Sequence, residues 1–272
     1  MISSKRFDIL RTILSVLIAL AISFGIIFLV SEEPVNAITN LLIGPLKSKR
    51  SLGNVVESMI PLIFTGTGVC IMFSANQINL AGEGAFHVGG LFATCIAIKL
   101  AAPFISPVTA LLCAGLAGAV FTAIPAIMKI TTTASELVSS LMINYIALYF
   151  GNYMLNNVIG DPDASAASYK LLEVSKLVKI VPGTRIHFGL IIAIGVAVLG
   201  YWFLYRTKAG YELRLTGENE EFARYSGINI VKVIIVSQLL GGFVAGLGGG
   251  VEMLSPIYSR FTWTSLMGYG WD

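Results

Sequence analysis

Long apolar runs alternate with short polar segments along the chain, and this pattern predicts helices that cross a membrane. A bilayer core about 30 Å thick needs roughly 20 apolar residues per helix. Seven runs come close to this length: about 9–30, 52–74, 84–101, 107–128, 137–155, 187–205 and 233–254. None alternates residue by residue, as membrane β-strands do. We therefore predict an all-α, polytopic membrane protein with about seven transmembrane helices in one domain over residues 1–272.

Composition and charge support this class and exclude others. Hydrophobic residues make up 56% of the chain and charged residues 12%, proportions that do not fit an ordinary soluble domain. A net charge of +3 gives no reason to expect a nucleic-acid partner. Lys and Arg fall evenly on the two sides of the predicted helices, so the positive-inside rule alone leaves the orientation tied. Lys5, Arg6 and Arg11 beside the first run favour a retained first helix with a cytoplasmic N-terminus.

The segment 74–84, SANQINLAGEG, is too polar to lie in lipid and too short to form a domain. Non-helical backbone at membrane depth is tolerated only where it faces protein or a water-filled cavity. A broken or re-entrant helix would place Asn76, Gln77, Asn79 and Glu83 beside a pathway. A simple cytoplasmic turn is the alternative, in which Glu83 caps the next helix and its carboxylate is stabilised by the positive end of the helix dipole. The sequence leaves both interpretations open.

Three polar residues lie at or within later runs. Glu136 falls in the first turn of the fifth run, after Ser and Thr residues suited to an N-cap. Asn144 follows two turns later, where it could hydrogen-bond a neighbouring helix or contact a solute. Glu252 ends the seventh run, and an ionisable group at such a depth is by default a functional hypothesis. The predicted translocation-pathway residues are Asn76, Asn79, Glu83, Glu136, Asn144 and Glu252.

The chain carries no recognisable catalytic or metal-binding motif. It has no GxxxxGK[ST] phosphate loop, which an ATP-hydrolysing site of this type would need. His87 and His187 are isolated and match no metal-ligand spacing. The three cysteines lie inside apolar runs at unrelated spacings, which favours packing roles. We therefore expect no enzymatic activity, cofactor or metal in this chain.

The segment 206–232, RTKAGYELRLTGENEEFARYSGINIVK, is the one sizeable charged block between two apolar runs. Residues 220–227 predict a short amphipathic helix that ends at Gly227. Phe222 and Tyr225 lie three positions apart and would form an aromatic patch on it. A solvated loop would not need such a patch, so the segment favours a docking element. The polar segment 156–186 is predicted to be a loop on the opposite side.

Three classes of function fit a polytopic protein of this kind. They are a permease driven by a separate subunit, a secondary transporter driven by an ion gradient, and a membrane enzyme or scaffold. Ion-coupled carriers place ionisable residues near the membrane midplane together with discontinuous helices. Carboxylates within the spans are few here, which favours the permease over the ion-driven transporter of a small polar solute.

Four stretches in order resemble bacterial ABC importer permeases of the branched-chain amino acid, simple-sugar and nucleoside group. Three are PLIFTG at 61–66, INLAGEG at 78–84 and SELVSSLMINY at 135–145. The fourth is similar to the cytoplasmic loop of these permeases, at Arg206, Thr207, Gly210, Leu213, Arg214, Gly217, Asn219, Ala223, Gly227 and Ile228. The Glu-x-Gly motif is typical of the nucleoside and simple-sugar branch. The chain departs from the pattern at Ala85 and Phe86, where a Gln is usual, and at Ser74, where an Arg is common.

This resemblance implies a permease of the bacterial cytoplasmic (inner) membrane with several partners. These are a second permease subunit, identical or different, two ABC ATPase subunits that hold ATP and Mg, and an extracytoplasmic substrate-binding lipoprotein. It makes 206–232 a cytoplasmic coupling loop and 156–186 an extracytoplasmic loop. This implies the orientation with a cytoplasmic N-terminus, which the count of Lys and Arg residues left undecided. The ATPase-coupling residues would be Glu218, Glu220, Glu221, Phe222, Ala223, Arg224, Tyr225 and Gly227. Family members continue past the motif at 268–272, so we expect the domain to be C-terminally incomplete.

Overall fold

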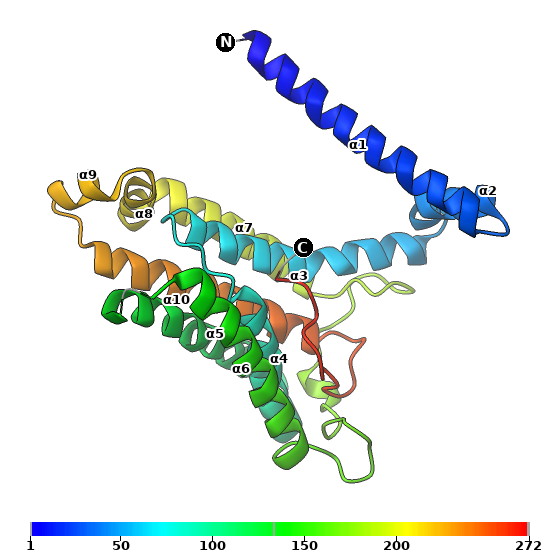
Figure 1. Ribbon diagram of the computed structural model, residues 1–272. Coiled ribbons are helices and arrows are strands. Elements are labelled where there is room, and N and C mark those ends of the chain that lie inside the picture. The colour runs from blue at the N-terminus through cyan, green and yellow to red at the C-terminus, as the bar shows by residue number, and fades with distance from the viewer. Residues whose placement is uncertain (1, 133, 271–272) are drawn as a thin grey trace. The chain divides into compact units, whose positions relative to one another are not determined.

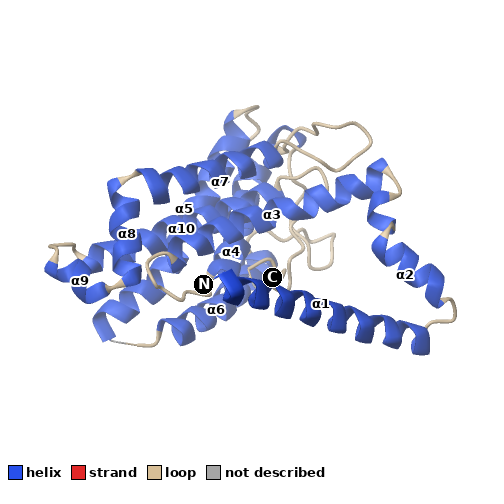
Figure 2. Ribbon diagram, turned by 90° about the horizontal axis from the view of Figure 1, so that it is seen from above, coloured by secondary structure: helices blue, strands red, loops and turns tan. Residues whose placement is uncertain are grey.

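The computed structural model describes residues 2–132 and 134–270, and within them every regular element is a helix (Figure 2). The chain divides into two compact units, Met1–Val55 and Val56–Asp272, called unit 1 and unit 2 below. The first elements are α1 (Ile2–Val30), α2 (Pro34–Leu42), η1 (Gly44–Leu46), α3 (Lys49–Phe73), α4 (Gly82–Lys99) and α5 (Ile105–Thr132). The remaining elements are α6 (Glu136–Asn157), η2 (Glu173–Ser175), α7 (Gly189–Arg206), α8 (Lys208–Glu218), α9 (Glu220–Tyr225) and α10 (Ile230–Met253).

The long helices coincide with the predicted runs, because α1, α3, α4, α5, α6, α7 and α10 each cover one of them. Five of these, within α1, α3, α5, α7 and α10, are long and apolar enough to cross a membrane. The other two, α4 and α6, carry a buried carboxylate in their first turn, Glu83 and Glu136. The prediction of a polytopic helical membrane protein is confirmed.

Unit 1 contains the long apolar helix α1, the short helix α2, η1 and the start of α3. The apolar side chains of α1 from Ile13 to Val30 are largely exposed, as expected for a helix whose surroundings are lipid. The helix α2 starts at Pro34, whose fixed φ suits the first helical position.

The core of unit 2 is built where α10 packs on α4 and α5 (Figure 1). Glycines bring the helix backbones almost into contact. A Cβ atom added to Gly89 of α4 would lie 2.2 Å from the carbonyl oxygen of Gly246 in α10. One added to Gly118 of α5 would lie 2.3 Å from the carbonyl oxygen of Gly242. Small residues at such positions let membrane helices approach closely, so these glycines have a packing role.

The segment 254–270 returns from the end of α10 into the bundle without regular structure. Trp263 stacks on Phe86 of α4, with ring centroids 5.6 Å apart. The amide of Gly268 donates to Glu83 Oε1 at 2.6 Å. Irregular backbone at membrane depth needs protein on its flanks, and α4 supplies it here. The sequence predicted a break only at 74–84, so this second irregular segment was missed.

The long loop 156–186 packs against segment 254–270. Its Asp161 accepts a hydrogen bond from Arg260 Nη1 at 2.6 Å. The backbone N–H of Asp163 and then the Arg260 guanidinium hold the pKa of the Asp161 carboxyl below its ordinary value. Figure 1 shows this loop, in light green to yellow-green, at the end of unit 2 that lies away from α8 and α9.

Candidate functional site

The charged block 206–232 forms two helices, α8 and α9, that meet at Asn219. The side chain of Asn219 caps α9, because its Oδ1 accepts a hydrogen bond from the amide of Phe222 at 2.9 Å. Gly227 follows with a φ of +82°, the left-handed conformation that ends many helices. The short helix expected over 220–227 is confirmed. The helix α8 was missed, and Glu218 lies at its end rather than in α9.

The helix α9 has one exposed aromatic face. Phe222 is 56% exposed and Tyr225 is 91% exposed. Arg224 Nη2 and Glu220 Oε1 form an exposed ion pair at 2.9 Å, four residues apart, the spacing that stabilises a helix surface. Glu221 is also exposed. Large exposed apolar side chains bordered by charges are typical of an interaction surface.

The opposite face of α9 is anchored in the bundle. Ala223 is fully buried and packs in one apolar cluster with Ala126 of α5 and Ile234 of α10. In a second cluster, Leu213 of α8 packs with Ala75, which follows α3. Close-packed interiors transmit displacement because they are hardly compressible. A partner that moves α9 would therefore move α5, α10 and the segment 74–81.

The expected break between α3 and α4 is present at 74–81. Gln77 and Asn79 are buried, at 4% and 0% exposure, while Ile78 between them is half exposed. Asn76 has a φ of 54° and lies on the surface, apart from the other predicted pathway residues. The side chain of Glu83 accepts from the amide of Gly268.

Two of the predicted pathway residues are joined through a residue that the sequence analysis did not single out. Gln238 of α10 donates from Nε2 to Glu136 Oε1 at 2.6 Å. It accepts at Oε1 from Asn79 Nδ2, also at 2.6 Å. Lys129 Nζ lies 2.9 Å from Glu136 Oε2. These contacts hold α6, α10 and the 74–81 segment together at the end of unit 2 that carries α8 and α9.

Asn144 and Glu83 line one cavity of about 420 Å³, together with Leu141, Met142, Tyr145 and Leu266. Asn144 Oδ1 accepts from the amide of Gly84 at 2.9 Å, and its Nδ2 donates to the carbonyl of Leu80 at 2.9 Å. This is the interhelical hydrogen bonding considered for Asn144. The cavity volume lies in the range of small-molecule sites.

Glu252 is separate from these residues, near the other end of α10. It lies beside Tyr258 and within electrostatic reach of Glu57. Its Oε2 atom is buried and has no hydrogen-bond partner among the described residues. The structure thus places the predicted pathway residues in three groups: Asn79 with Glu136, Glu83 with Asn144, and Glu252 by itself, with Asn76 outside all three.

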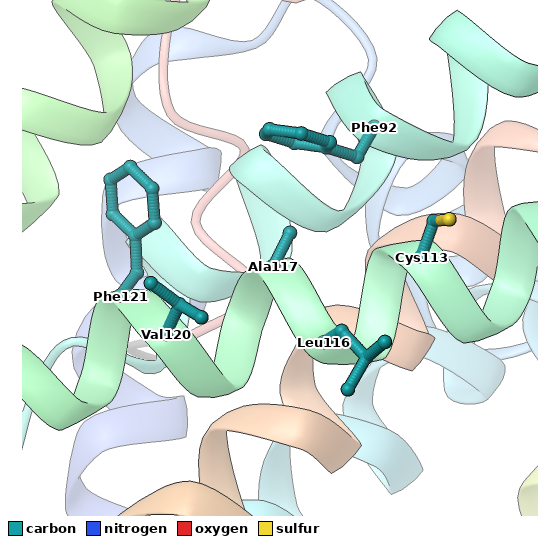
Figure 3. Close-up of a pocket in the computed structure, with 6 residues that line it drawn as sticks. All are labelled: Phe92, Cys113, Leu116, Ala117, Val120 and Phe121. Carbon is teal, nitrogen blue, oxygen red and sulfur yellow. The ribbon is translucent and has the colours of Figure 1, made fainter.

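An apolar groove of about 320 Å³ lies between α4 and α5 (Figure 3). Its lining residues are Phe92, Cys113, Leu116, Ala117, Val120 and Phe121. These side chains offer no nitrogen or oxygen to a polar solute. Leu116 and Val120 are more than half exposed, so the groove belongs to a surface that faces lipid or protein.

The long apolar helices define a multi-pass membrane protein. Residues 51–272 match the family described as "Branched-chain amino acid transport system / permease component". The chain belongs to this family, as the four sequence stretches indicated.

Known relatives of the chain are permeases. It is 30% identical over 225 residues to the guanosine ABC transporter permease protein NupP of Bacillus subtilis, covering 81% of this chain and 65% of NupP. It is 29% identical over 270 residues to a glucose ABC transporter permease protein of Haloferax volcanii, covering 95% and 71%. It is 28% identical over 258 residues to the nucleoside ABC transporter permease protein NupB of Lactococcus lactis, covering 89% and 70%. The chain thus spans about two thirds of the length of these relatives. No solved structure matches it significantly.

Proposed function

We propose that this chain is the membrane-spanning permease subunit of an ABC importer. It translocates a nucleoside or a simple sugar that an extracytoplasmic binding protein delivers, and separate subunits hydrolyse ATP. The observation that carries the proposal is α9, which exposes Phe222 and Tyr225 while Ala223 anchors it to α5 and α10. The relatives named for guanosine, nucleosides and glucose support the class of solute.

In this proposal α9 binds a groove on an ATPase subunit. Phe222 and Tyr225 are the anchors, because exposed aromatic side chains dominate the binding energy of many interfaces. Glu220, Glu221 and Arg224 lie at the rim of the contact. The ATP and Mg belong to the ATPase, and the chain itself has no enzymatic activity.

Docking of α9 sets the orientation of the chain. It places α8, α9 and the N-terminus in the cytoplasm of a bacterium, with the chain in the cytoplasmic membrane. The loop 156–186 then faces the binding lipoprotein on the other side. A second permease subunit completes the transporter.

The cavity beside Glu83 and Asn144 is the proposed solute pathway. Glu83 and Asn144 fix the wall of this cavity, because their side chains hold the backbone of Gly268, Gly84 and Leu80. Tyr145 is 54% exposed beside them, so its ring can stack on a base or a sugar face. Asn76, Asn79, Glu136 and Glu252 lie outside this cavity lining.

Uptake by the reconstituted transporter tests the proposal. Proteoliposomes that contain the permeases, the ATPase subunits and the binding protein are given labelled guanosine or glucose. Accumulation should require ATP on the ATPase side and survive a protonophore. Uptake that follows a proton gradient and persists without ATPase subunits would instead establish an ion-driven secondary transporter and refute the proposal.

A further inference from the structure

The buried polar contacts around Gln238 form one continuous network. Lys129 Nζ donates to Gln77 Oε1 at 2.5 Å and to Glu136 Oε2 at 2.9 Å. Gln238 Nε2 donates to Glu136 Oε1, and Asn79 Nδ2 donates to Gln238 Oε1, both at 2.6 Å. The network therefore starts and ends in segment 74–81 and passes through α5, α6 and α10.

This network has a single orientation. Exchanging the amide oxygen and nitrogen of Gln238 would set two NH₂ groups against each other at Asn79 and two oxygens against each other at Glu136. Glu136 accepts at both oxygens, so the network fits its carboxylate form. Gln238 and Asn79 are fully buried. A buried polar network with every member satisfied holds its parts in one arrangement, and losing one member is costly.

The network lies one helical turn from the anchor of α9. Ala223 of α9 packs with Ile234 on α10 and Ala126 on α5. Gln238 follows Ile234 by four residues, and Thr122 precedes Ala126 by four, so each pair shares one helix face. Thr122 Oγ1 donates to the carbonyl oxygen of Gln238 at 2.9 Å. A displacement of α9 thus reaches the network along both helices.

We propose that Gln238 is a positioning residue that passes the movement of α9 to α6 and to segment 74–81. This inference rests on the proposed function, because it needs an ATPase that moves α9. While Gln238 bridges Glu136 and Asn79, the segment and the start of α6 follow α10. When the bridge is broken, ATP hydrolysis continues and fewer solute molecules cross per ATP.

An exchange of carboxylate and amide tests this role. Gln238→Glu sets a second carboxylate against Glu136, and Glu136→Gln removes the charge that Lys129 pairs with. In the double variant every contact is restored. The new carboxylate at position 238 accepts from Asn79 and from the new amide at position 136, whose oxygen accepts from Lys129. Asn40→Asp is the control for the charge that Gln238→Glu adds, since it makes the same change at an exposed position of α2, where a carboxylate still accepts from Lys47.

The measured quantity is the number of guanosine or glucose molecules taken up per ATP hydrolysed by the assembled transporter in proteoliposomes. Each single variant should lower this ratio at least tenfold while still binding the ATPase. The double variant should return to within threefold of the wild-type ratio, and Asn40→Asp should keep the wild-type ratio. A purely structural role would lower the amount of protein in the membrane without changing the ratio.

Three results would overturn the inference. The single variants could keep the wild-type ratio, or the double variant could do no better than they do. If the single variants do not reach the membrane, Gln238→Met replaces them, because methionine has about the length of glutamine, makes neither hydrogen bond of the bridge and sets no second charge against Glu136. An unchanged ratio in that variant would be the third. A wild-type transporter without ATP-driven uptake would instead contradict the proposed function itself.

Discussion

Removing the two exposed aromatic side chains of α9 should detach the permease from its ATPase. In the double variant Phe222→Ala/Tyr225→Ala, little packing within the chain is lost, because Tyr225 is 91% exposed and Phe222 is 56% exposed. Insertion and folding should therefore match the wild type, and the loss should appear only in the contact with the partner.

The exposed areas set the size of the effect. At about 200 Å² per aromatic side chain and about 25 cal/mol per Å², covering these rings is worth at most roughly 4.5 kcal/mol for Tyr225 and about 3 kcal/mol for Phe222. Truncation of a central aromatic anchor typically costs about 2–4 kcal/mol. The Kd for the ATPase subunit should therefore rise by roughly 30-fold or more for Tyr225→Ala and by about 10³-fold for the double variant.

The assay is the equilibrium binding of purified ATPase subunit to detergent-solubilised permease, followed by ATP-driven uptake in proteoliposomes. Tyr211→Ala serves as the control, because Tyr211 on neighbouring α8 is also 56% exposed. The Kd of this variant for the ATPase subunit should differ from the wild-type Kd by less than threefold. A double variant that binds within threefold of the wild type, or that still transports on ATP, would show that α9 is not the docking helix.

Three further predictions concern the stability of the fold. Gly246→Ala should lower the free energy of unfolding by about 1–3 kcal/mol, since the new Cβ would lie 2.4 Å from the carbonyl oxygen of Ala114. Gly195→Ala is the control and should leave the stability unchanged, because nothing lies within 4 Å of its Cβ position. Equal unfolding midpoints of the two variants in detergent would contradict the packing role of Gly246. Asn144→Leu removes the hydrogen bonds of the Asn144 side chain to the amide of Gly84 and the carbonyl of Leu80, and should lower the free energy of unfolding by about 0.6–2 kcal/mol. Thermal unfolding in detergent measures this loss. An unchanged unfolding midpoint would argue against these hydrogen bonds. The pKa of the Asp161 carboxyl is lowered in the folded chain, so the stability that its ion pair with Arg260 contributes is present above the unfolded pKa and is lost as pH falls through the folded pKa. Asp161→Asn should therefore make the 156–186 loop more sensitive to protease at pH 7, and the difference should vanish in acid. Equal cleavage of the variant and the wild type at pH 7 would refute the role of the ion pair.

The long helices could be predicted from the sequence because apolar length alone determines them. The run predicted at 52–74 is Lys49–Phe73, and the run at 84–101 is Gly82–Lys99. The helix α8 was not predicted, since its eleven residues mix charges with few apolar positions. Local signals were present: Thr207 caps α8 by accepting from the amide of Gly210. Helix propensity alone does not stabilise so short a helix, so α8 depends on its packing against α10 and the segment after α3.

The candidate site was predictable only where its signal is local. The aromatic patch of α9 could be read from two residues three positions apart. Gln238 could not, because a lone amide in an apolar run indicates no particular partner, and Asn79 lies 159 positions away. The irregular path of 254–270 was also beyond reach, since it has no periodicity and is held by single contacts such as that of Trp263 with Phe86.

The backbone contacts of α10 with α4 and α5 have a mechanical consequence. Where Gly246 meets Gly89 and Gly242 meets Gly118, no side chain can change rotamer to let one helix slide past another. The three helices must then tilt as one stiff body. The 24 residues of α10 span about 36 Å, so a tilt of about 5° at the α9 end moves the opposite end by about 3 Å. A small angular change at the α9 end of α10 therefore reaches the end where the 156–186 loop lies with the same angle.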